Sequence, residues 1–329
     1  VDRMEDKMKL IELALTMAYD AKVNYVDVMF QVRMWDTIIY NYLKKRDIVV
    51  PPRDRSDKEK RYEGAYVKQP IPGVYDWVVS FDLNSLYPHL MMQYNISPET
   101  LIEEKHPSAT IDRILNKEIT FEMYKDYAVC ANGAMFRKDI RGFMPELMEK
   151  MYAERKIYKK KMLQAQQEYE KKPTKQLEKD IAKYNNFQMA RKIALNSCYG
   201  AIGNQYFRFF KLANAEAITL SGQTSIRWIE NKVNGYLNNL LQTHDTDYVI
   251  ASDTDSIYIN FGPIVDKFLS SKSDNKVEVV SILNKICEEK LEPFIEESYQ
   301  ELATYVNAYD QKMQMKRENI ADRGIWTAK

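Results

Sequence analysis

The chain has 329 residues, of which 45% are hydrophobic and 12% aromatic, enough for more than one packed core. The formal net charge is +1, and the three cysteines and three histidines lie far apart, which argues against a disulfide framework and against a zinc site. No segment approaches the roughly 20 consecutive apolar residues that cross a bilayer, so we expect a soluble, intracellular protein without a membrane partner.

The charged residues are unevenly distributed along the chain. Between Lys150 and Lys192 there are 13 Lys and Arg against 5 Asp and Glu, whereas acidic residues gather near Asp253 and Asp255. A basic segment and an acidic centre in one chain suit an enzyme that holds phosphates and metal ions together.

The N-terminal part of the chain combines predicted helices with a long connection. Apolar residues recur at helical spacing near 10–17, and a second helix is predicted over 34–44. The segment 49–72 is rich in proline and charge, which predicts a mostly solvated connection. A buried strand follows at 77–81, with Asp82 at its end, and leads into a predicted helix over 86–94.

The middle of the sequence predicts a pair of long helices over 145–171 and 175–199. The break at Lys172-Pro173-Thr174 is short, so the two helices should form an antiparallel hairpin. The remaining elements are a helix, two short strands and two further helices before a polar end, predicted over 213–240, 248–251, 256–259, 277–291 and 296–307.

Three carboxylates lie where strands are predicted to end. Asp82 closes one strand, and Asp253 and Asp255 stand in the connection between two others. Strand ends rich in carboxylates suit Mg²⁺, which prefers oxygen ligands and substrate phosphates. Two such ions about 4 Å apart stabilise both the attacking and the leaving oxygen in phosphoryl transfer. An Asp-x-Asp pair is also common as a simple polar turn, so the pair alone leaves both interpretations open.

Three motifs favour the metal-site interpretation. Ser80–Pro88 (SFDLNSLYP), Lys192–Gly200 (KIALNSCYG) and Ser252–Ser256 (SDTDS) resemble, in order, the three polymerase motifs of the family B DNA polymerases. The similarity extends over essentially the whole chain and is strongest to the replicative polymerases of tailed phages.

The resemblance implies template-directed DNA synthesis, with nucleotidyl transfer from a deoxynucleoside triphosphate to a primer 3′-hydroxyl. The metal ligands it implies are the carboxylates of Asp82 and Asp255 and the carbonyl of Leu83, with Asp253 in a supporting role. Glu318 is implied as an accessory acidic residue near the primer end. The implied cofactor is a pair of Mg²⁺ ions, with Mn²⁺ as an alternative.

The predicted hairpin carries the residues expected at the triphosphate. Lys192 and Asn196 lie one helical turn apart, as do Arg155 and Lys159, so two such pairs can converge if the helices are antiparallel. Arginine offers phosphate a planar fork and lysine a point charge. A solvated surface is the alternative for a charged hairpin. The complete nucleotide-binding set implied by the resemblance is Arg155, Lys159, Lys192, Asn196, Leu83, Ser85, Leu86, Tyr87, Tyr199 and Gly200.

Tyr87 is implied to pack under the deoxyribose and exclude a 2′-hydroxyl, although a tyrosine in a helix is otherwise typical of core packing. Tyr199 and Gly200 are implied to pack against the nascent base pair. The sequence departs from the family pattern at Asn84 and His89, and also at Ala251-Ser252, where the family usually has Tyr-Gly.

The fold expected from these observations is α+β, with an antiparallel-sheet palm of ferredoxin-like core, a two-helix fingers hairpin, no thumb and no complete exonuclease domain. The expected domains are an N-terminal exonuclease remnant at 1–53, the first part of the palm at 54–141, the fingers at 142–203 and the second part of the palm at 204–329, truncated before the thumb.

The expected partners are primer–template DNA and deoxynucleoside triphosphates, in the cytoplasm of a phage-infected host cell. Further candidate partners are a thumb-bearing polymerase chain, an exonuclease-bearing chain and a sliding clamp. Two alternative functions remain open at this point. In the first, the chain is a piece of a split polymerase that is inactive until a thumb-bearing chain joins it. In the second, it is a metal-dependent nuclease, which explains the carboxylates but not the basic hairpin.

Overall fold

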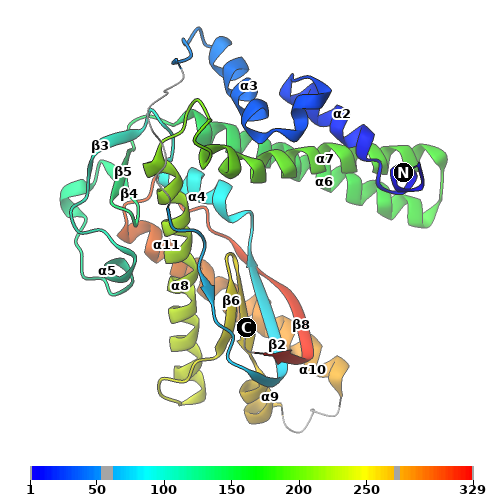
Figure 1. The fold of residues 1–329 in the computed structure, drawn as a ribbon. Helices are drawn as coiled ribbons and strands as arrows, with labels where there is room; N and C mark the ends of the chain where they lie inside the picture. Colours follow the sequence, from blue (N-terminus) through cyan, green and yellow to red (C-terminus); the bar gives the residue numbers. More distant parts are fainter. Residues whose placement is uncertain (1, 53–61, 270–274, 328–329) are drawn as a thin grey trace. The chain divides into compact units, whose positions relative to one another are not determined.

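The computed structural model describes residues 2–52, 62–269 and 275–327 (Figure 1). Helices and antiparallel sheets are combined in it, which confirms the expected α+β class. The chain divides into two compact units, unit 1 with Val1–Arg61 and Gly142–Ala215, and unit 2 with Tyr62–Arg141 and Glu216–Lys329. The domain boundary expected at 53/54 lies outside the described residues. Within the described ranges, no helix is both long enough and apolar enough to span a membrane.

Unit 1 is helical, and its largest feature is the predicted antiparallel hairpin. Arg191 meets Glu154 (3.0 Å), and the rings of Phe187 and Tyr158 lie 5.1 Å apart, so the two long helices run in opposite directions. Thr174 caps the second helix by accepting a hydrogen bond from an amide three residues on (3.2 Å). The helices of unit 1 are α1 (Asp2–Met8), α2 (Leu10–Ala21), η1 (Tyr25–Met29), α3 (Gln31–Lys44), α6 (Phe143–Lys171) and α7 (Lys175–Ile202).

The N-terminal helices pack against α7 in the same unit. Trp35 of α3 is fully buried, and its indole nitrogen donates to Ser197 Oγ of α7 (3.1 Å). Asp20 of α2 pairs with Arg191 of α7, which also binds Glu154 of α6. These contacts fix the orientation of α7 about its axis, because both the indole and the guanidinium are directional donors.

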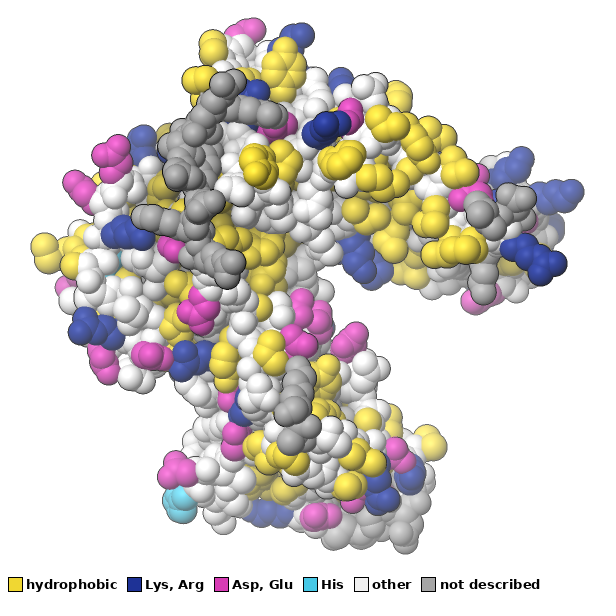
Figure 2. Space-filling view, viewed as in Figure 1, with side chains coloured by type: hydrophobic (Ala, Val, Ile, Leu, Met, Phe, Trp, Pro, Cys, Tyr) yellow, Lys and Arg dark blue, Asp and Glu magenta, His cyan; other side chains and the backbone are white. Residues whose placement is uncertain are grey.

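One surface of unit 1 remains apolar. Several large hydrophobic side chains on or beside α2 are exposed, and hydrophobic side chains are grouped on the visible face of unit 1 (Figure 2). Surfaces of this kind are typical of contact sites for other protein segments. The exposed residues of this stretch include Leu10, Ile11, Leu15, Tyr19, Val26, Met29 and Phe30.

Unit 2 is organised around a five-stranded antiparallel sheet in the order β1-β6-β7-β2-β8. The long strand β2 is buried over most of its C-terminal half, from Trp77 to Phe81. The strands are β1 (Val67–Lys68), β2 (Gly73–Leu83), β6 (Val249–Asp253), β7 (Ser256–Asn260) and β8 (Met315–Trp326).

Two of these strands contradict the sequence-based expectations. The connection predicted over 49–72 contains β1, which has two residues and therefore no readable alternation. The polar end contains β8, whose side chains are mostly half-buried or exposed. Both are edge strands of the sheet, where hydrophobic patterning is weakest because one side of the strand faces no neighbour.

Helices and a second sheet complete unit 2. Helix α8 packs on α11, since Trp228 donates to the carbonyl of Ser298 (2.9 Å) and Tyr299 donates to that of Ser225 (3.3 Å). A small sheet has the order β3-β5-β4. The remaining elements are α4 (Leu86–Tyr94), β3 (Leu101–Lys105), α5 (Ile111–Leu115), η2 (Glu122–Tyr124), β4 (Tyr127–Val129), β5 (Ala134–Arg137), α8 (Leu212–Leu241, which begins in unit 1), α9 (Gly262–Phe268), α10 (Lys276–Ile286), a π-helical turn (Cys287–Leu291) and α11 (Glu292–Tyr305).

All three cysteines are buried and carry free thiols. Burial raises the pKa of Cys130 and of Cys287 to about 12, and it also raises the pKa of Cys198. The thiolate is the reactive form of cysteine, so none of these side chains has the character of a nucleophile.

Replacing Trp35 tests the packing that holds α7. We expect Trp35→Ala to lower the free energy of unfolding of unit 1 by about 3–5 kcal/mol, because it empties a fully buried aromatic site. Urea unfolding followed by far-UV circular dichroism measures this change. The matched control is Tyr19→Ala, which removes a side chain that is 85% exposed and should alter stability by no more than about 0.5 kcal/mol. Equal effects of the two substitutions would contradict the burial described above.

Candidate functional site

The pairing of β2 with β7 brings Asp82 and Asp255 to neighbouring positions. Asp82 is aligned with Ser256, and one residue further along, the amide of Leu83 donates to the carbonyl of Asp255 (2.8 Å). Two carboxylates that are 173 residues apart in the sequence therefore meet at one end of the sheet. Asp82 and Asp255 are both half-buried, whereas Asp253 is exposed.

The turn between β6 and β7 is tight and strained. Thr254 has a φ of 55°, which is unfavourable for a β-branched residue. The amide of Asp255 donates back to the carbonyl of Asp253 (2.6 Å), and the amide of Thr254 donates to the carbonyl of Tyr66 (3.0 Å). Thr254 Oγ1 also donates to Asp253 Oδ1 (3.0 Å). Thr254 and Asp255 thus form a turn, which interrupts the strand geometry that would place Asp253 and Asp255 on one face.

Glu318 lies opposite the same strand end, in a β-bulge of β8. Ser80 is aligned with Asn319 and Phe81 with Arg317, so Glu318 is the extra residue between them. A bulge redirects the side chain that it contains. Although Glu318 is an exposed residue of an edge strand, its charge raises the pKa of Asp255.

The carboxyl of Asp255 lies in a negative environment. Burial raises its pKa above the ordinary value of 3.8, its own backbone amide opposes the shift, and the charges of Asp253 and Glu318 raise the pKa further. Among the described residues, no cation contributes to this balance. An acidic centre of this kind favours the binding of a positive ion.

The donors at this centre suit magnesium better than a metal held entirely by protein. The described residues contain no group of three or more His, Cys, Asp and Glu side chains arranged to hold a metal ion. Magnesium is often bound through one or two carboxylates, with water and substrate phosphates completing its octahedron. Asp82, Asp255 and the carbonyl of Leu83 are oxygen donors and therefore fit such an ion.

Tyr87 lies close to the same centre, on the first turn of α4. Its side chain is half-buried, and its pKa is raised by burial and then by the charge of Asp255. A Cβ atom at Gly222 of α8 would lie 3.6 Å from Tyr87 Cε1, so α8 packs directly against the tyrosine ring. The neighbouring Leu86 is buried, and Ser85 takes the N-cap position with a φ of 49°.

The departure from the family pattern at His89 is accommodated by packing. His89 is buried, and its Nδ1 lies 3.0 Å from the carbonyl oxygen of Ser85. The imidazole therefore contacts the backbone of the turn that precedes α4.

In unit 1, the four predicted triphosphate residues lie on facing helices of the hairpin. Since Glu154 meets Arg191, Arg155 and Lys192 stand at the same level of α6 and α7. Lys159 is one turn nearer the tip of the hairpin and Asn196 one turn nearer its base. Arg155 is half-buried, whereas the side chains of Lys159, Lys192 and Asn196 are exposed and accessible to a ligand.

Tyr199 and Gly200 lie further along α7, in its last turns. Tyr199 is half-buried. A Cβ atom at Gly200 would lie 2.0 Å from Gln31 Oε1, so the absence of a side chain lets α3 approach α7 closely here.

A cavity of about 390 Å³ in unit 1 lies beside the hairpin, with Glu154 and Arg191 in its lining. Helices α2, α3, α6 and α7 line it, with Met34, Ile38 and Met151 among the apolar contacts. None of its lining residues belongs to the predicted site. It is best understood as a packing feature of unit 1.

Sequence reasoning missed the residues that hold β1 beside the acidic turn. Lys68, Glu230 and Asp247 form a cluster in unit 2, in which Lys68 and Glu230 are half-buried and Asp247 is exposed. Lys68 is separated from its partners by 162 and 179 residues in the sequence. No local pattern of the sequence reveals contacts between residues so far apart.

The charge at Asp255 predicts a pH-dependent stability effect. Because its folded pKa is raised, the folded chain gains stability from this group below pH 3.8 and loses it as the pH rises through the folded pKa. In a chelator at neutral pH, Asp255→Asn should therefore have a higher unfolding temperature than the unaltered chain, and the difference should shrink towards pH 4.

Differential scanning calorimetry at both pH values, with and without Mg²⁺, measures the effect. Added Mg²⁺ should stabilise the unaltered chain more than the Asn variant. A variant that is less stable than the unaltered chain in chelator at neutral pH would contradict the electrostatic account.

The chain is similar to known proteins over most of its length. Residues 30–307 match the family model described as DNA polymerase family B. The chain is 35% identical to the DNA-directed DNA polymerase of Escherichia phage RB69 and 33% identical to that of Enterobacteria phage T4, over 99% and 98% of this chain. It is also 29% identical, over 69% of its length, to DNA polymerase 1 of Pyrococcus abyssi, strain GE5 / Orsay, of which it covers 25%. The chain spans 41% of the length of each phage polymerase. It belongs to DNA polymerase family B.

Proposed function

We propose that this chain carries the nucleotidyl-transfer centre of a template-directed DNA polymerase. In the proposed reaction, the 3′-hydroxyl of a primer attacks the α-phosphorus of a deoxynucleoside triphosphate, and pyrophosphate leaves. The observation that carries the proposal is the hydrogen bond between the Leu83 amide and the Asp255 carbonyl, which keeps two family-motif carboxylates at adjacent strand ends.

The carboxylates of Asp82 and Asp255 and the carbonyl of Leu83 would hold two Mg²⁺ ions, with Mn²⁺ as an alternative. Bound there, such ions would offset negative charge on the phosphates and favour ionisation of the primer hydroxyl. Asp253 and Glu318 support the site by adding negative charge around Asp255. The raised pKa of Asp255 means that the metal-free centre resists losing its proton, so cation binding and deprotonation are coupled.

The hairpin would bind the triphosphate. Arg155 offers a planar fork to phosphate oxygens, Lys159 and Lys192 supply point charges, and Asn196 donates a neutral hydrogen bond. Arg155 and Lys192 stand at the same level of α6 and α7, Lys159 and Asn196 lie one turn to either side, and three of the four side chains are exposed, which supports this role. The proposal requires the hairpin and the carboxylates to act on the same triphosphate.

Tyr87 would select the sugar. Its ring lies against α8 and within the electrostatic influence of Asp255, so it has little freedom to move aside for a 2′-hydroxyl. Ser85 and Leu86, which precede it, would line the same part of the nucleotide site. Tyr199 and Gly200 would contact the nascent base pair by shape.

The two units then take the names expected from the sequence, with the sheet of unit 2 as the ferredoxin-like palm and the hairpin of unit 1 as the fingers. Primer–template DNA would be the macromolecular substrate. A thumb-bearing chain, an exonuclease-bearing chain and a sliding clamp are proposed partners, and the phage relatives point to the cytoplasm of an infected cell.

Primer extension by the purified chain tests the proposal. At low salt, where phosphate contacts are strongest, the chain should extend a labelled primer when deoxynucleoside triphosphates and Mg²⁺ are supplied. Asp82→Asn and Asp255→Asn should each lower the rate at least about 100-fold, because each removes charge at the reacting phosphate. The matched control is Asp245→Asn, an exposed acid in the loop before β6, which should extend at the unaltered rate.

Three other outcomes separate the alternatives. Extension that appears only after a thumb-bearing chain is added would identify a piece of a split polymerase. Strand cleavage without nucleotides, abolished in Asp255→Asn, would identify a nuclease. Equal extension by Asp255→Asn and the unaltered chain would refute the proposed centre.

Tyr87 can be tested separately by the choice between deoxyribonucleotides and ribonucleotides. We expect Tyr87→Ala to reduce discrimination against ribonucleotides by about 10- to 100-fold, since it removes the ring that excludes a 2′-hydroxyl. Single-nucleotide incorporation with matched pairs of triphosphates measures the ratio. Tyr87→Phe retains the ring and should keep the discrimination, so a loss of selectivity in the Phe variant would argue for a role of the hydroxyl instead.

A further inference from the structure

One side of α8 carries a row of polar side chains that reaches the edge strand β1 within unit 2. Gln223, Arg227, Glu230 and Asn234 follow one another at helical spacing, so they lie on one face; we call them the α8 polar row. Gln223 donates to the carbonyl of Gly64 (2.7 Å), just before β1. Arg227 lies over the ring of Tyr66 at 5.7 Å from its centre.

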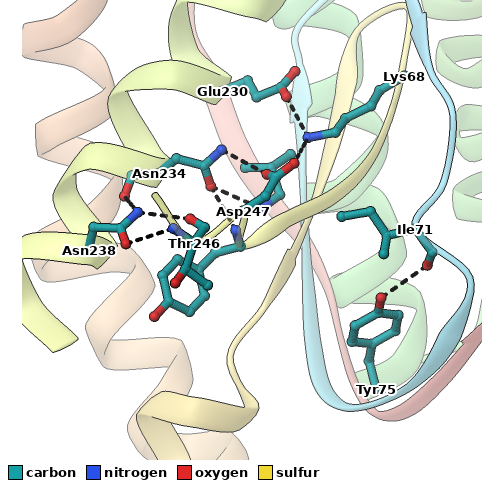
Figure 3. Close-up of polar contacts among 10 residues, drawn as sticks. Lys68, Ile71, Tyr75, Glu230, Asn234, Asn238, Thr246 and Asp247 are labelled. Carbon is teal, nitrogen blue, oxygen red and sulfur yellow. Dashed lines mark hydrogen bonds and ion pairs between the residues drawn. The ribbon is translucent and has the colours of Figure 1, made fainter. Parts of the chain in front are cut away.

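Lys68 joins β1 to this row and to the start of β6. Its ammonium lies 2.5 Å from Glu230 Oε1 and 2.6 Å from Asp247 Oδ2, and its side chain is only 13% exposed. Asp247 also accepts a hydrogen bond from Asn234 (2.8 Å), whose own oxygen accepts one from the amide of Val249 (3.1 Å), the first residue of β6. Figure 3 shows Lys68 reaching towards Glu230 and Asp247 while Asn234 contacts Asp247 from α8. Two strands and one helix are thus joined through a single ammonium.

These contacts extend to the acidic turn through the backbone of β1. Lys68 is aligned with Ser252 of β6, and the carbonyl of Tyr66 accepts the hydrogen bond from Thr254. Thr254 has the strained φ of 55°, and such conformations persist only where the surroundings hold them. Because β1 has only two residues and lies at the sheet edge, few backbone hydrogen bonds hold it, among them those of Tyr66 with Thr254 and of Ile71 with Ile250. The side-chain contacts of Lys68 add to them from outside the sheet.

The Lys68 cluster is poorly suited to a role in stability alone. One ammonium serves two carboxylates, and Glu230 Oε2 is buried without a hydrogen-bond partner. Burial raises the pKa of Glu230 even though Lys68 opposes the shift. Burial lowers the pKa of Lys68, but its hydrogen bonds to Asp247 and Glu230 outweigh this effect, and the net change is upward. Well-packed apolar side chains often stabilise a fold as much as a buried ion pair does. What the charged cluster provides beyond stability is a fixed direction for each hydrogen bond of Lys68.

We propose that Lys68 is a positioning residue for nucleotidyl transfer: by bridging Glu230 and Asp247 it fixes the register of β1 against β6, and β1 in turn holds the Thr254 turn that presents Asp255. This inference rests on the proposed function of the Asp82 and Asp255 centre. Lys68 itself touches no reacting group.

Three variants of the full chain test the proposal. Lys68→Met keeps the length of the side chain and removes the charge, whereas Lys68→Arg keeps the charge. The matched control is Lys232→Met, which removes another ammonium of α8 that is paired with Glu301 (2.6 Å) and has no hydrogen bond to β1 or β6 among the described contacts.

We expect Lys68→Met to lower kcat for primer extension by about 10- to 100-fold, because a small displacement of a reacting group has an effect of this size. The KM for the triphosphate should change by less than about threefold, since Lys68 does not contact the nucleotide. Hydrogen exchange at the Thr254 amide should become faster in the same variant. Lys68→Arg should restore most of kcat and of the exchange protection. Lys232→Met should match the unaltered chain in both measurements, whatever its effect on the urea midpoint.

The proposal is overturned if Lys68→Met leaves either kcat or Thr254 exchange as in Lys232→Met, since Lys68 would then contribute only stability. Failure of Lys68→Arg to restore either quantity would equally exclude positioning by charge. A chain that extends no primer in unaltered form refutes the proposed function and not the β1 contact, because the exchange rate at Thr254 decides that contact without any substrate.

Discussion

The antiparallel ladder between β2 and β7 is the constraint on which the candidate site depends. It aligns five consecutive pairs, from Val78 with Asn260 to Asp82 with Ser256. A slip of one residue would turn the buried residues Val79 and Phe81 to the other face of the sheet. The apolar pattern of the strand therefore protects the position of the carboxylate at its end, and the same burial that stabilises unit 2 determines where Asp82 meets its partner.

Destabilising features are concentrated around that meeting point. Thr254 is strained, Asp255 is half-buried among other acids, and Glu318 occupies a bulge. The strain at Thr254 and the acidic surroundings of Asp255 lower the stability of this region, as is common where a fold is shaped for a ligand. The contacts around the turn offset this loss of stability because they are either buried or directional. They are made by the β2–β7 ladder, by α4 and by the Lys68 cluster. The contacts outside the turn therefore stabilise the strained conformation of Thr254 within it.

The sequence predicted the parts of the structure that carry long periodic patterns or contiguous motifs. The predicted features were the α+β class, the hairpin of α6 and α7, the helix α4 and the strand that leads to Asp82. Strands β1 and β8 were missed because edge strands lack a strong apolar alternation, and the bulge at Glu318 depends on pairing that only the fold reveals. The roles of the site residues came from resemblance to a family. The contacts of Lys68 join residues so distant in sequence that neither periodicity nor motif could indicate them.

The buried cysteines have a practical consequence for following the molecule in solution. Cys130, Cys198 and Cys287 are inaccessible, and burial keeps them protonated, so thiol-directed dyes will leave them unmodified in the folded chain. A cysteine introduced at the exposed Lys179, near the tip of the hairpin, would then accept a fluorophore selectively without any prior removal of native thiols. The unaltered chain is thus already suited to site-specific fluorescence at the hairpin.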